Sequence, residues 1–327
     1  MADYINIYGQ DILAVASDPA NPTLGQIWYN TTSNTLKGEG YAAGSWATGG
    51  NLNTARRGLA GCGTQTAGLA FGGYPGSPPL SNATEEYDGT SWVTSPGTLN
   101  TARAGLAGTG TQTAGLAIGG GTPTITGATE EYDGSTWTTS PPGLNTARDN
   151  NLAGAGIQTA ALAFGGRNTT PAVTGATESY DGNSWTTSPG SLNTARQTLA
   201  GAGTQTAALA FGGETPPSTA ATEEYDGNSW TTVNSMNTAR LNLAGCGTQT
   251  AAVAFGGDLD PGTSGATEEY DGTSWSTSPA SMSTARSNLG EAGTQASALA
   301  FGGTPGVLTA TEEWTGSAPT TVTITAS

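Results

Sequence analysis

The chain has 327 residues, with 25 Asp and Glu against 9 Lys and Arg, and its formal net charge is −16. It contains no histidine, so Ser-His and Cys-His nucleophilic sites are excluded. The acidity argues against nucleic acid and anionic membranes as partners. No apolar run approaches the roughly 20 residues of a membrane helix, so no membrane insertion is expected. The first residues lack the basic region and apolar core of a signal peptide.

Residues 1–45 form a segment with strand-like stretches of its own. Residues 4–8 alternate in a strand-like way, and residues 25–38 predict a hairpin that ends at Lys37-Gly38. The run Gly-Gln-Ile-Trp-Tyr-Asn at 25–30 resembles segments near the start of bacteriophage tail-fibre and other virion proteins. The resemblance implies that this segment attaches to other virion proteins or forms a homo-oligomer. The alternative is an extra hairpin that packs on the rest of the fold.

A repeated unit fills most of the remaining chain. Its leading arginine recurs at intervals of 44–48 residues, at Arg56, Arg103, Arg148, Arg196, Arg240 and Arg286. Each copy holds four short strand-like runs, which in the second copy span 102–108, 114–119, 126–132 and 137–139. Asp133-Gly134, between the last two runs, is a strong signal for a tight hairpin. Four antiparallel strands per ~45 residues is the pattern of a propeller blade.

The motif within each copy resembles the kelch family of β-propellers. The arginine precedes the first strand, Gly-Gly follows the second, and in the first five copies a Tyr is followed five residues later by a Trp. The resemblance covers about residues 46–316 and implies an all-β fold, a six-bladed kelch-like β-propeller with four antiparallel strands per blade. It implies no activity. We therefore expect three parts: an N-terminal attachment or oligomerisation segment (1–45), the propeller (46–318) and a C-terminal strand or tail (319–327).

The two ends of the repeated region predict how the ring closes. In the sixth copy the residue at the expected Trp position is Pro319, whereas Trp46 stands in an orphan strand-like run before the first copy. We expect this run to complete the last blade, so that N- and C-terminal strands pair. The tail at 320–326 is a rival fourth strand, a fifth strand or a contact with another subunit.

Two kinds of repeated side chain are predicted to be structural. Each leading Arg should be partly buried against carbonyls or a Glu, because an unpaired buried charge is too costly. Large aromatic residues should fill the gaps between blades, namely Trp46, Trp92, Trp137, Trp185, Trp230 and Trp275. Cys62 and Cys246 occupy the same small-residue position of non-neighbouring copies, so we expect small buried residues without a disulfide.

One loop, between the second and third strands of each copy, varies most in length and chemistry, and loops on a rigid scaffold carry function. It supplies the candidate ligand-binding residues Tyr74, Arg167, Glu214, Asp258 and Asp260. The alternatives are tolerated surface loops, or a ring of glutamines on the opposite face. We attribute those glutamines to hydrogen bonding within their turns. Glu291, which replaces a repeated Gly, is either a solvated channel carboxylate or a cation ligand.

Catalysis is not expected. Kelch-type sugar oxidases use a copper site with His ligands, so their activity cannot be carried over to a chain without histidine. We expect no catalytic residue, metal or cofactor. The favoured function is a structural or recognition protein of a bacteriophage particle, a fibre, tail or capsid appendage, that presents propeller loops to a host-surface glycan or protein. Its location would be the virion. The alternative is a cellular or secreted kelch-type module for protein–protein interaction.

Overall fold

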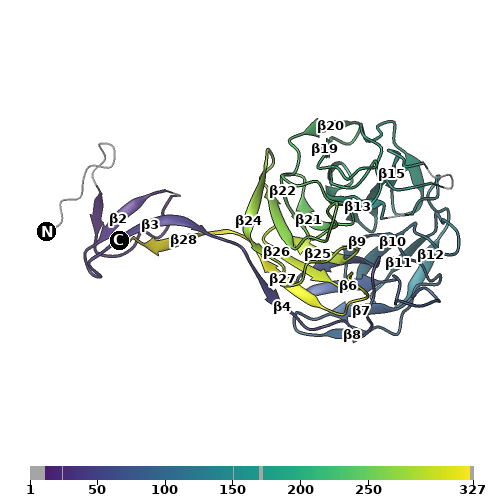
Figure 1. Ribbon diagram of the computed structural model, residues 1–327, viewed down its shortest axis with the longest axis horizontal. Coiled ribbons are helices and arrows are strands. Elements are labelled where there is room, and N and C mark those ends of the chain that lie inside the picture. The colour runs from purple at the N-terminus through teal and green to yellow at the C-terminus, as the bar shows by residue number, and fades with distance from the viewer. Residues whose placement is uncertain (1–11, 24, 150, 169–171, 325–327) are drawn as a thin grey trace. The chain divides into compact units, whose positions relative to one another are not determined.

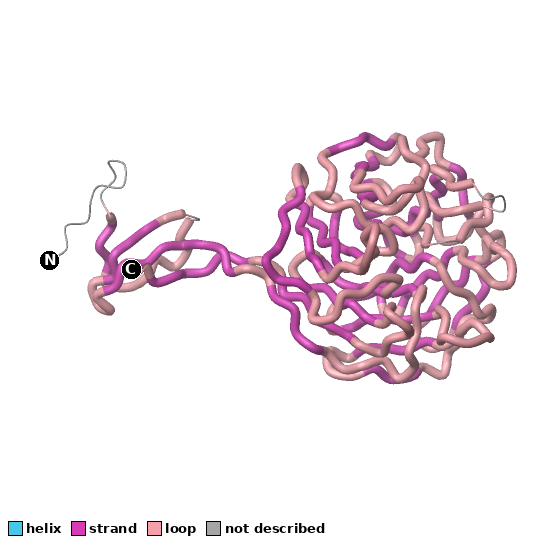
Figure 2. The backbone as a smooth tube through the Cα atoms, in the orientation of Figure 1, coloured by secondary structure: helices cyan, strands magenta, loops and turns pink. Residues whose placement is uncertain are grey.

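A computed structural model describes residues 12–23, 25–149, 151–168 and 172–324 (Figure 1). All regular elements in these residues are strands, with no helix among them (Figure 2). The strands form seven four-stranded sheets. The chain divides into two compact units, one spanning Ser45–Gly316 and the other combining Met1–Gly44 with Ser317–Ser327. We call the first the repeat unit and the second the terminal unit.

The repeat unit contains six sheets of one design, numbered here sheet 1 to sheet 6 in chain order. The first strands are β5 (Ala60–Thr64), β9 (Ala107–Thr111), β13 (Ala153–Ile157), β17 (Ala200–Thr204), β21 (Ala244–Thr248) and β25 (Gly290–Thr294). The second strands are β6 (Ala67–Phe71), β10 (Ala114–Ile118), β14 (Ala160–Phe164), β18 (Ala207–Phe211), β22 (Ala251–Phe255) and β26 (Ser297–Phe301). In every sheet these two strands pair antiparallel across a tight turn.

The outer half of each sheet holds the third and fourth strands. The third strands are β7 (Thr84–Tyr87), β11 (Thr129–Tyr132), β15 (Thr177–Tyr180), β19 (Thr222–Tyr225), β23 (Ala266–Tyr270) and β27 (Thr311–Thr315). The fourth strands are β8 (Trp92–Thr94), β12 (Trp137–Ser140), β16 (Trp185–Thr187), β20 (Trp230–Val233), β24 (Trp275–Ser281) and, in sheet 6, β4 (Ser45–Thr48). The repeated Tyr therefore lies opposite the repeated Trp, as in Tyr132 against Trp137.

The six sheets follow one another around a common centre in a propeller-like arrangement. Their first strands contact one another in chain order, and β25 also contacts β5. β4 pairs antiparallel with β27 and places Trp46 opposite Trp314, so the prediction that the Trp46 run completes the last sheet is confirmed. None of the sheets found in the described residues is closed on itself, so the circuit is closed by contacts between sheets.

The expected number of sheets was wrong, because the structure has seven rather than six. The seventh is the terminal unit, with strand order β1 (Leu13–Val15), β2 (Ile27–Asn30), β3 (Thr35–Ala42) and β28 (Ala318–Thr323). The predicted hairpin at 25–38 is present as β2 and β3. β28 pairs antiparallel with β3, because its alternating tail finds an open strand edge there. Residues 4–8 lie outside the described residues.

One acidic side chain organises the polar side of the terminal sheet. Asp18 accepts hydrogen bonds from the indole of the buried Trp28 and the amide of Asn30, and it forms an ion pair of 2.6 Å with Lys37. These partners lower the pKa of Asp18 to about 2, and the hydrogen bond from Lys37 contributes most. Three elements of the small sheet, β2, β3 and the segment before β2, are thereby joined through one carboxylate.

Each repeated Trp joins its own sheet to the sheet before it. The indole Nε1 of Trp137 in sheet 2 donates to Thr84 Oγ1 at the start of β7 in sheet 1, at 2.9 Å. Trp92 of sheet 1 donates in the same way to Thr311 of sheet 6, which closes the circuit. The other four bonds are Trp185 to Thr129, Trp230 to Thr177, Trp275 to Thr222 and Trp46 to Thr267. These tryptophans therefore join neighbouring sheets through directed hydrogen bonds as well as through apolar packing.

The repeated glutamines also bond between sheets, which corrects the prediction that they bond within their own turns. Gln112 Nε2, in the first turn of sheet 2, donates to the carbonyl oxygens of Gly68 and Tyr87 in sheet 1, at 3.1 and 2.7 Å. Gln65 reaches from sheet 1 to Ala298 and Trp314 of sheet 6. The same pair of bonds is made by Gln158, Gln205, Gln249 and Gln295. The carbonyls they satisfy lie on the facing sheet, beyond the reach of a local turn.

Every leading Arg is buried inside its own sheet. All six guanidinium groups have 0% side-chain exposure and form ion pairs of 2.6–3.2 Å with the first Glu of the third strand. Arg56 also donates to the carbonyls of Gly72 and Ala83. Burial lowers the pKa of Arg56, while the charge of Glu85 opposes this shift. The predicted pairing is confirmed, and the burial is complete where partial burial was expected.

Removing one member of such a pair should cost much more stability than removing a surface pair. Arg196→Gln leaves Glu223 buried without its cation, so we expect a loss of about 3–5 kcal/mol in unfolding free energy. The control is Arg167→Gln, which removes an ion pair whose Arg side chain is 40% exposed, with an expected loss within about 1 kcal/mol. Urea denaturation measures both, and equal losses would contradict the prediction.

Candidate ligand-binding site

One face of the repeat unit, called here the variable face, is built by two segments that pair at the start of each sheet. The residue after each buried Arg forms an isolated antiparallel bridge with the residue after Gly-Gly. The six bridges are Arg57–Tyr74, Ala104–Gly121, Asp149–Arg167, Gln197–Glu214, Leu241–Asp258 and Ser287–Thr304. The residues at the two ends of these bridges form two columns, and both columns differ from sheet to sheet. The Trp, Thr and Gln side chains that join neighbouring sheets repeat instead.

The Gly-Gly pair makes this close approach possible. Gly72 and Gly73 have φ angles of +68° and +99°, in the left-handed region that favours glycine. A Cβ on Gly73 would also lie 2.9 Å from Cβ of Leu59, closer than side chains pack. The chain can therefore turn over the start of β5, which brings Tyr74 next to Arg57.

The five residues predicted to bind a ligand do not converge on one point. Tyr74 lines a cavity of about 360 Å³ on the variable face, but Arg167, Glu214, Asp258 and Asp260 are not among its lining residues. Arg167 forms a two-point ion pair with Asp149, with both N–O distances 3.1 Å. Glu214 accepts a hydrogen bond of 2.7 Å from Gln197. Asp260 is exposed.

The cavity has polar residues that the sequence interpretation did not single out. Its lining includes Arg57, Asp149, Asn151 and Asn288 beside Tyr74. The Arg57 guanidinium carbon lies 5.1 Å from the centre of the Tyr74 ring, a cation–π contact. The signal was present in the sequence, because the residue after each leading Arg varies as much as the residue after Gly-Gly.

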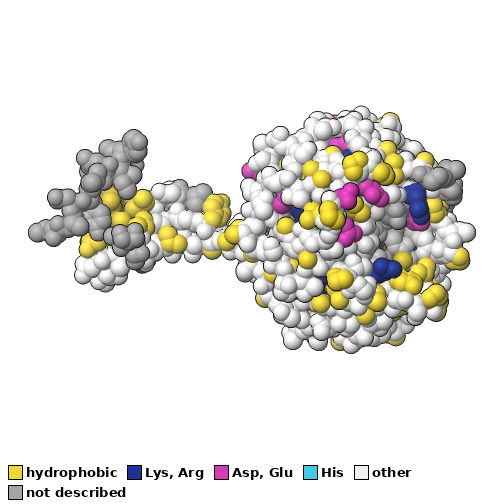
Figure 3. All heavy atoms as spheres, viewed as in Figure 1, with side chains coloured by type: hydrophobic (Ala, Val, Ile, Leu, Met, Phe, Trp, Pro, Cys, Tyr) yellow, Lys and Arg dark blue, Asp and Glu magenta, His cyan; other side chains and the backbone are white. Residues whose placement is uncertain are grey.

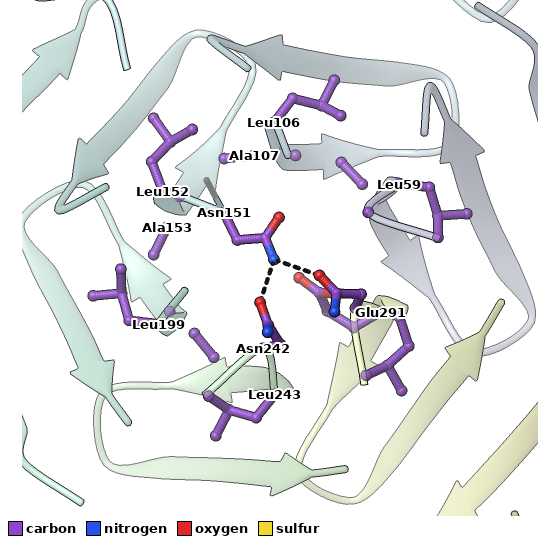
Figure 4. Close-up of a pocket in the computed structure, with 18 residues that line it drawn as sticks. Leu59, Leu106, Ala107, Asn151, Leu152, Ala153, Leu199, Asn242, Leu243 and Glu291 are labelled. Atoms are coloured by element: carbon purple, nitrogen blue, oxygen red, sulfur yellow. Dashed lines mark hydrogen bonds between the residues drawn. The ribbon is translucent and has the colours of Figure 1, made fainter. Parts of the chain in front are cut away.

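A ring of backbone hydrogen bonds surrounds the centre of this face. Equivalent residues of the six sheets, Gly58, Gly105, Asn151, Thr198, Asn242 and Asn288, all have φ angles between +49° and +62°. The amide of each of five of these residues donates to the carbonyl of the preceding member, and the bond from Gly58 N to Asn288 O, at 2.8 Å, joins sheet 1 to sheet 6. The side-chain amide of Asn151 donates to Oδ1 of both Asn242 and Asn288, at 3.1 and 3.3 Å (Figure 4).

Asp258 is tied to this central asparagine cluster. Asn242 Nδ2 donates to Asp258 Oδ2 at 3.1 Å, while its own Oδ1 accepts from Asn151. The carboxylate of Asp258 also accepts from the hydroxyl of Thr263. The side chains of Asp258, Asn242 and Asn151 therefore form a chain of hydrogen bonds from the loop of sheet 5 to the cavity. Asp258 does not line the cavity, but it holds Asn242, which in turn holds Asn151.

Glu291 occupies the axial channel inside the ring of first strands (Figure 4). It stands where the other five sheets have Gly, and it lines two sections of the channel of about 50 and 110 Å³. Burial raises the pKa of its carboxyl to about 8. Cys62 and Cys246 line the second section as free thiols, as expected, and burial together with the nearby Glu291 raises the pKa of both.

Comparison with models of known protein families gave no match, and no curated protein matched the chain significantly. No helix within the described ranges is long and apolar enough to cross a membrane. The same residues contain no group of three or more His, Cys, Asp or Glu that could hold a metal ion. The fold and its variable face are therefore the basis for a functional proposal.

The carboxyl of Glu291, which lines the axial channel, should make stability depend on pH in a defined interval. The folded chain holds this proton up to a pKa of about 8, whereas the pKa of a glutamate in the unfolded chain is 4.5, so stability falls as pH rises between these values. Relative to Glu291→Gln, the wild-type chain should lose on the order of 3–5 kcal/mol across the interval. Urea denaturation at pH 5 and pH 8.5 measures this difference, and parallel profiles for the two proteins would show that the carboxyl is not desolvated.

Proposed function

We propose that the chain is a kelch-like β-propeller that acts as a non-enzymatic recognition module. The observation that carries the proposal is the separation of constant and variable residues in the six repeats. The side chains that join neighbouring sheets repeat around the circuit, while the paired columns at Arg57 and Tyr74 differ in every sheet. Loops that vary on a rigid scaffold are the usual carriers of binding function.

The cavity on the variable face supports binding in preference to chemistry. At about 360 Å³ it falls within the range of small-molecule sites, and it combines an aromatic ring with amide and charged groups. Asp149, the single carboxylate among the described residues that line it, is held in the two-point ion pair with Arg167. A carboxylate committed in this way suits the fixing of a ligand or a loop better than proton transfer.

We propose a bacteriophage particle as the setting, with the variable face presented to a host-surface glycan or protein. The support is the resemblance of residues 25–30 to segments of virion proteins, and the place of β2 in one four-stranded sheet with β1, β3 and β28, which belongs to the terminal unit and not to the repeats. A cellular or secreted kelch-type module is the alternative. Detection of the chain at a fixed place on purified virions separates the two.

The binding face is tested with two matched substitutions of threonine. Thr122→Trp places a bulky ring in the wall of the cavity, whereas Thr113→Trp places the same ring on the exposed first turn of sheet 2. We expect glycan-array or host-surface binding to weaken by roughly tenfold or more in the first variant and to be unchanged in the second. The opposite pattern would move the binding site to the turn face.

A further inference from the structure

We propose that the cavity on the variable face recognises an acidic saccharide, and that Arg57 binds its anionic group. This inference rests on the proposed recognition function and specifies its ligand class. It comes from asking where positive charge is available on a strongly acidic chain. Figure 3 shows few Lys and Arg side chains on the visible face of the repeat unit.

Nearly every cation of the repeat unit is already neutralised. The six leading arginines are fully buried, and each is paired with a glutamate. Arg167 is held by both oxygens of Asp149. Arg57 is exposed, and among the described residues it forms no ion pair. Because Asp149 is compensated by Arg167, Arg57 leaves the cavity with one net positive charge, on a chain whose net charge is −16.

The contacts of Arg57 hold its guanidinium in place without accepting hydrogen bonds from its N–H groups. Its backbone is fixed by two hydrogen bonds with Tyr74: the Arg57 amide donates to the Tyr74 carbonyl at 3.1 Å, and the Tyr74 amide donates to the Arg57 carbonyl at 2.8 Å. Its guanidinium lies over the Tyr74 ring, whose hydroxyl is bound to the carbonyl of Gly76. An aromatic face attracts the cation but accepts none of its in-plane N–H groups in a conventional hydrogen bond. The planar fork is therefore free for a carboxylate or sulfate.

The remaining wall of the cavity suits the hydroxyl groups of a sugar. Asn151 Oδ1 and the remaining lone pairs of the Asp149 carboxylate are acceptors for hydroxyl groups, the side-chain amide of Asn288 is a donor, and Tyr74 and Leu80 add apolar surface. The net negative charge of the chain repels anions at a distance, so an anionic ligand must gain its affinity from direct contact. Selectivity for the anionic group should consequently depend on this one guanidinium.

The test compares three probes by isothermal titration calorimetry: a disaccharide ending in glucuronic acid, the same disaccharide ending in glucose, and a 6-sulfated form of the glucose probe. We expect one or both acidic probes to bind roughly tenfold or more tightly than the neutral probe. Arg57→Gln should abolish the difference, and Arg57→Lys should restore part of it. Asp260→Asn, an exposed charge change outside the cavity, should leave the discrimination intact.

The other outcomes separate this inference from the proposed function. Equal affinity for acidic and neutral probes, or binding of no acidic probe, overturns the acidic specificity, while loss of glycan-array or host-surface binding in Thr122→Trp still supports a recognition site. A preference for acidic probes that survives Arg57→Gln overturns the role of Arg57. Binding that is lost in Thr113→Trp and kept in Thr122→Trp overturns both proposals. Equal urea midpoints for Arg57→Gln and the wild-type chain exclude unfolding as the cause of lost binding.

Discussion

The constraint on which the repeat unit depends is that every sheet must fit both of its neighbours with the same side chains. In each sheet the Trp indole and the Gln amide donate to the sheet before it, while a Thr hydroxyl and two backbone carbonyls accept from the sheet after it. Since the circuit returns to its start, the junction of sheet 6 with sheet 1 must satisfy the same rule, and Trp92 and Gln65 do so. Because every sheet must donate to one neighbour and accept from the other, the Trp, Thr and Gln residues at the contacts between sheets are the same in every repeat.

Inside each sheet, the Arg–Glu pair fixes the segment that enters from the preceding sheet. In sheet 1, Glu85 binds the guanidinium of Arg56 and the backbone amide of Asn53, so one carboxylate holds both ends of that segment. A buried pair of this kind contributes little net stability compared with an apolar substitute, but it is costly to leave half made. The entering segment therefore has one favourable position, which places the residue after Arg at the same point of every sheet.

The sequence indicated which side chains repeat and where the repeat is broken, but it did not indicate contacts whose partners lie on another part of the fold. The pairing of Arg56 with a glutamate and the role of Trp46 followed from charge burial and from the missing Trp at Pro319. The contacts of the glutamines could not be predicted from the sequence, because the carbonyls that accept their hydrogen bonds lie on a neighbouring sheet. The pairing of β28 with β3 was equally hidden, since alternating Thr and Val suit any open strand edge. At the candidate site, the residues predicted from the sequence include Tyr74, which lines the cavity, but not Arg57, because Arg57 directly follows the repeated Arg56.

The variable face shows how loops can differ while the scaffold remains constant. Three of its acidic side chains have local partners: Asp149 has Arg167, Glu214 has Gln197, and Asp258 has Asn242, whereas Asp260 is exposed. Each partner comes from the opposing column or its neighbour, so a change in one loop is compensated within its own sheet and does not disturb the contacts between sheets. Pairing also leaves little free charge on the surface. Among the described cations of this face, Arg57 is the exception, since its partner is an aromatic ring that leaves the charge in place, and for this reason we propose it as the group that distinguishes one ligand from another.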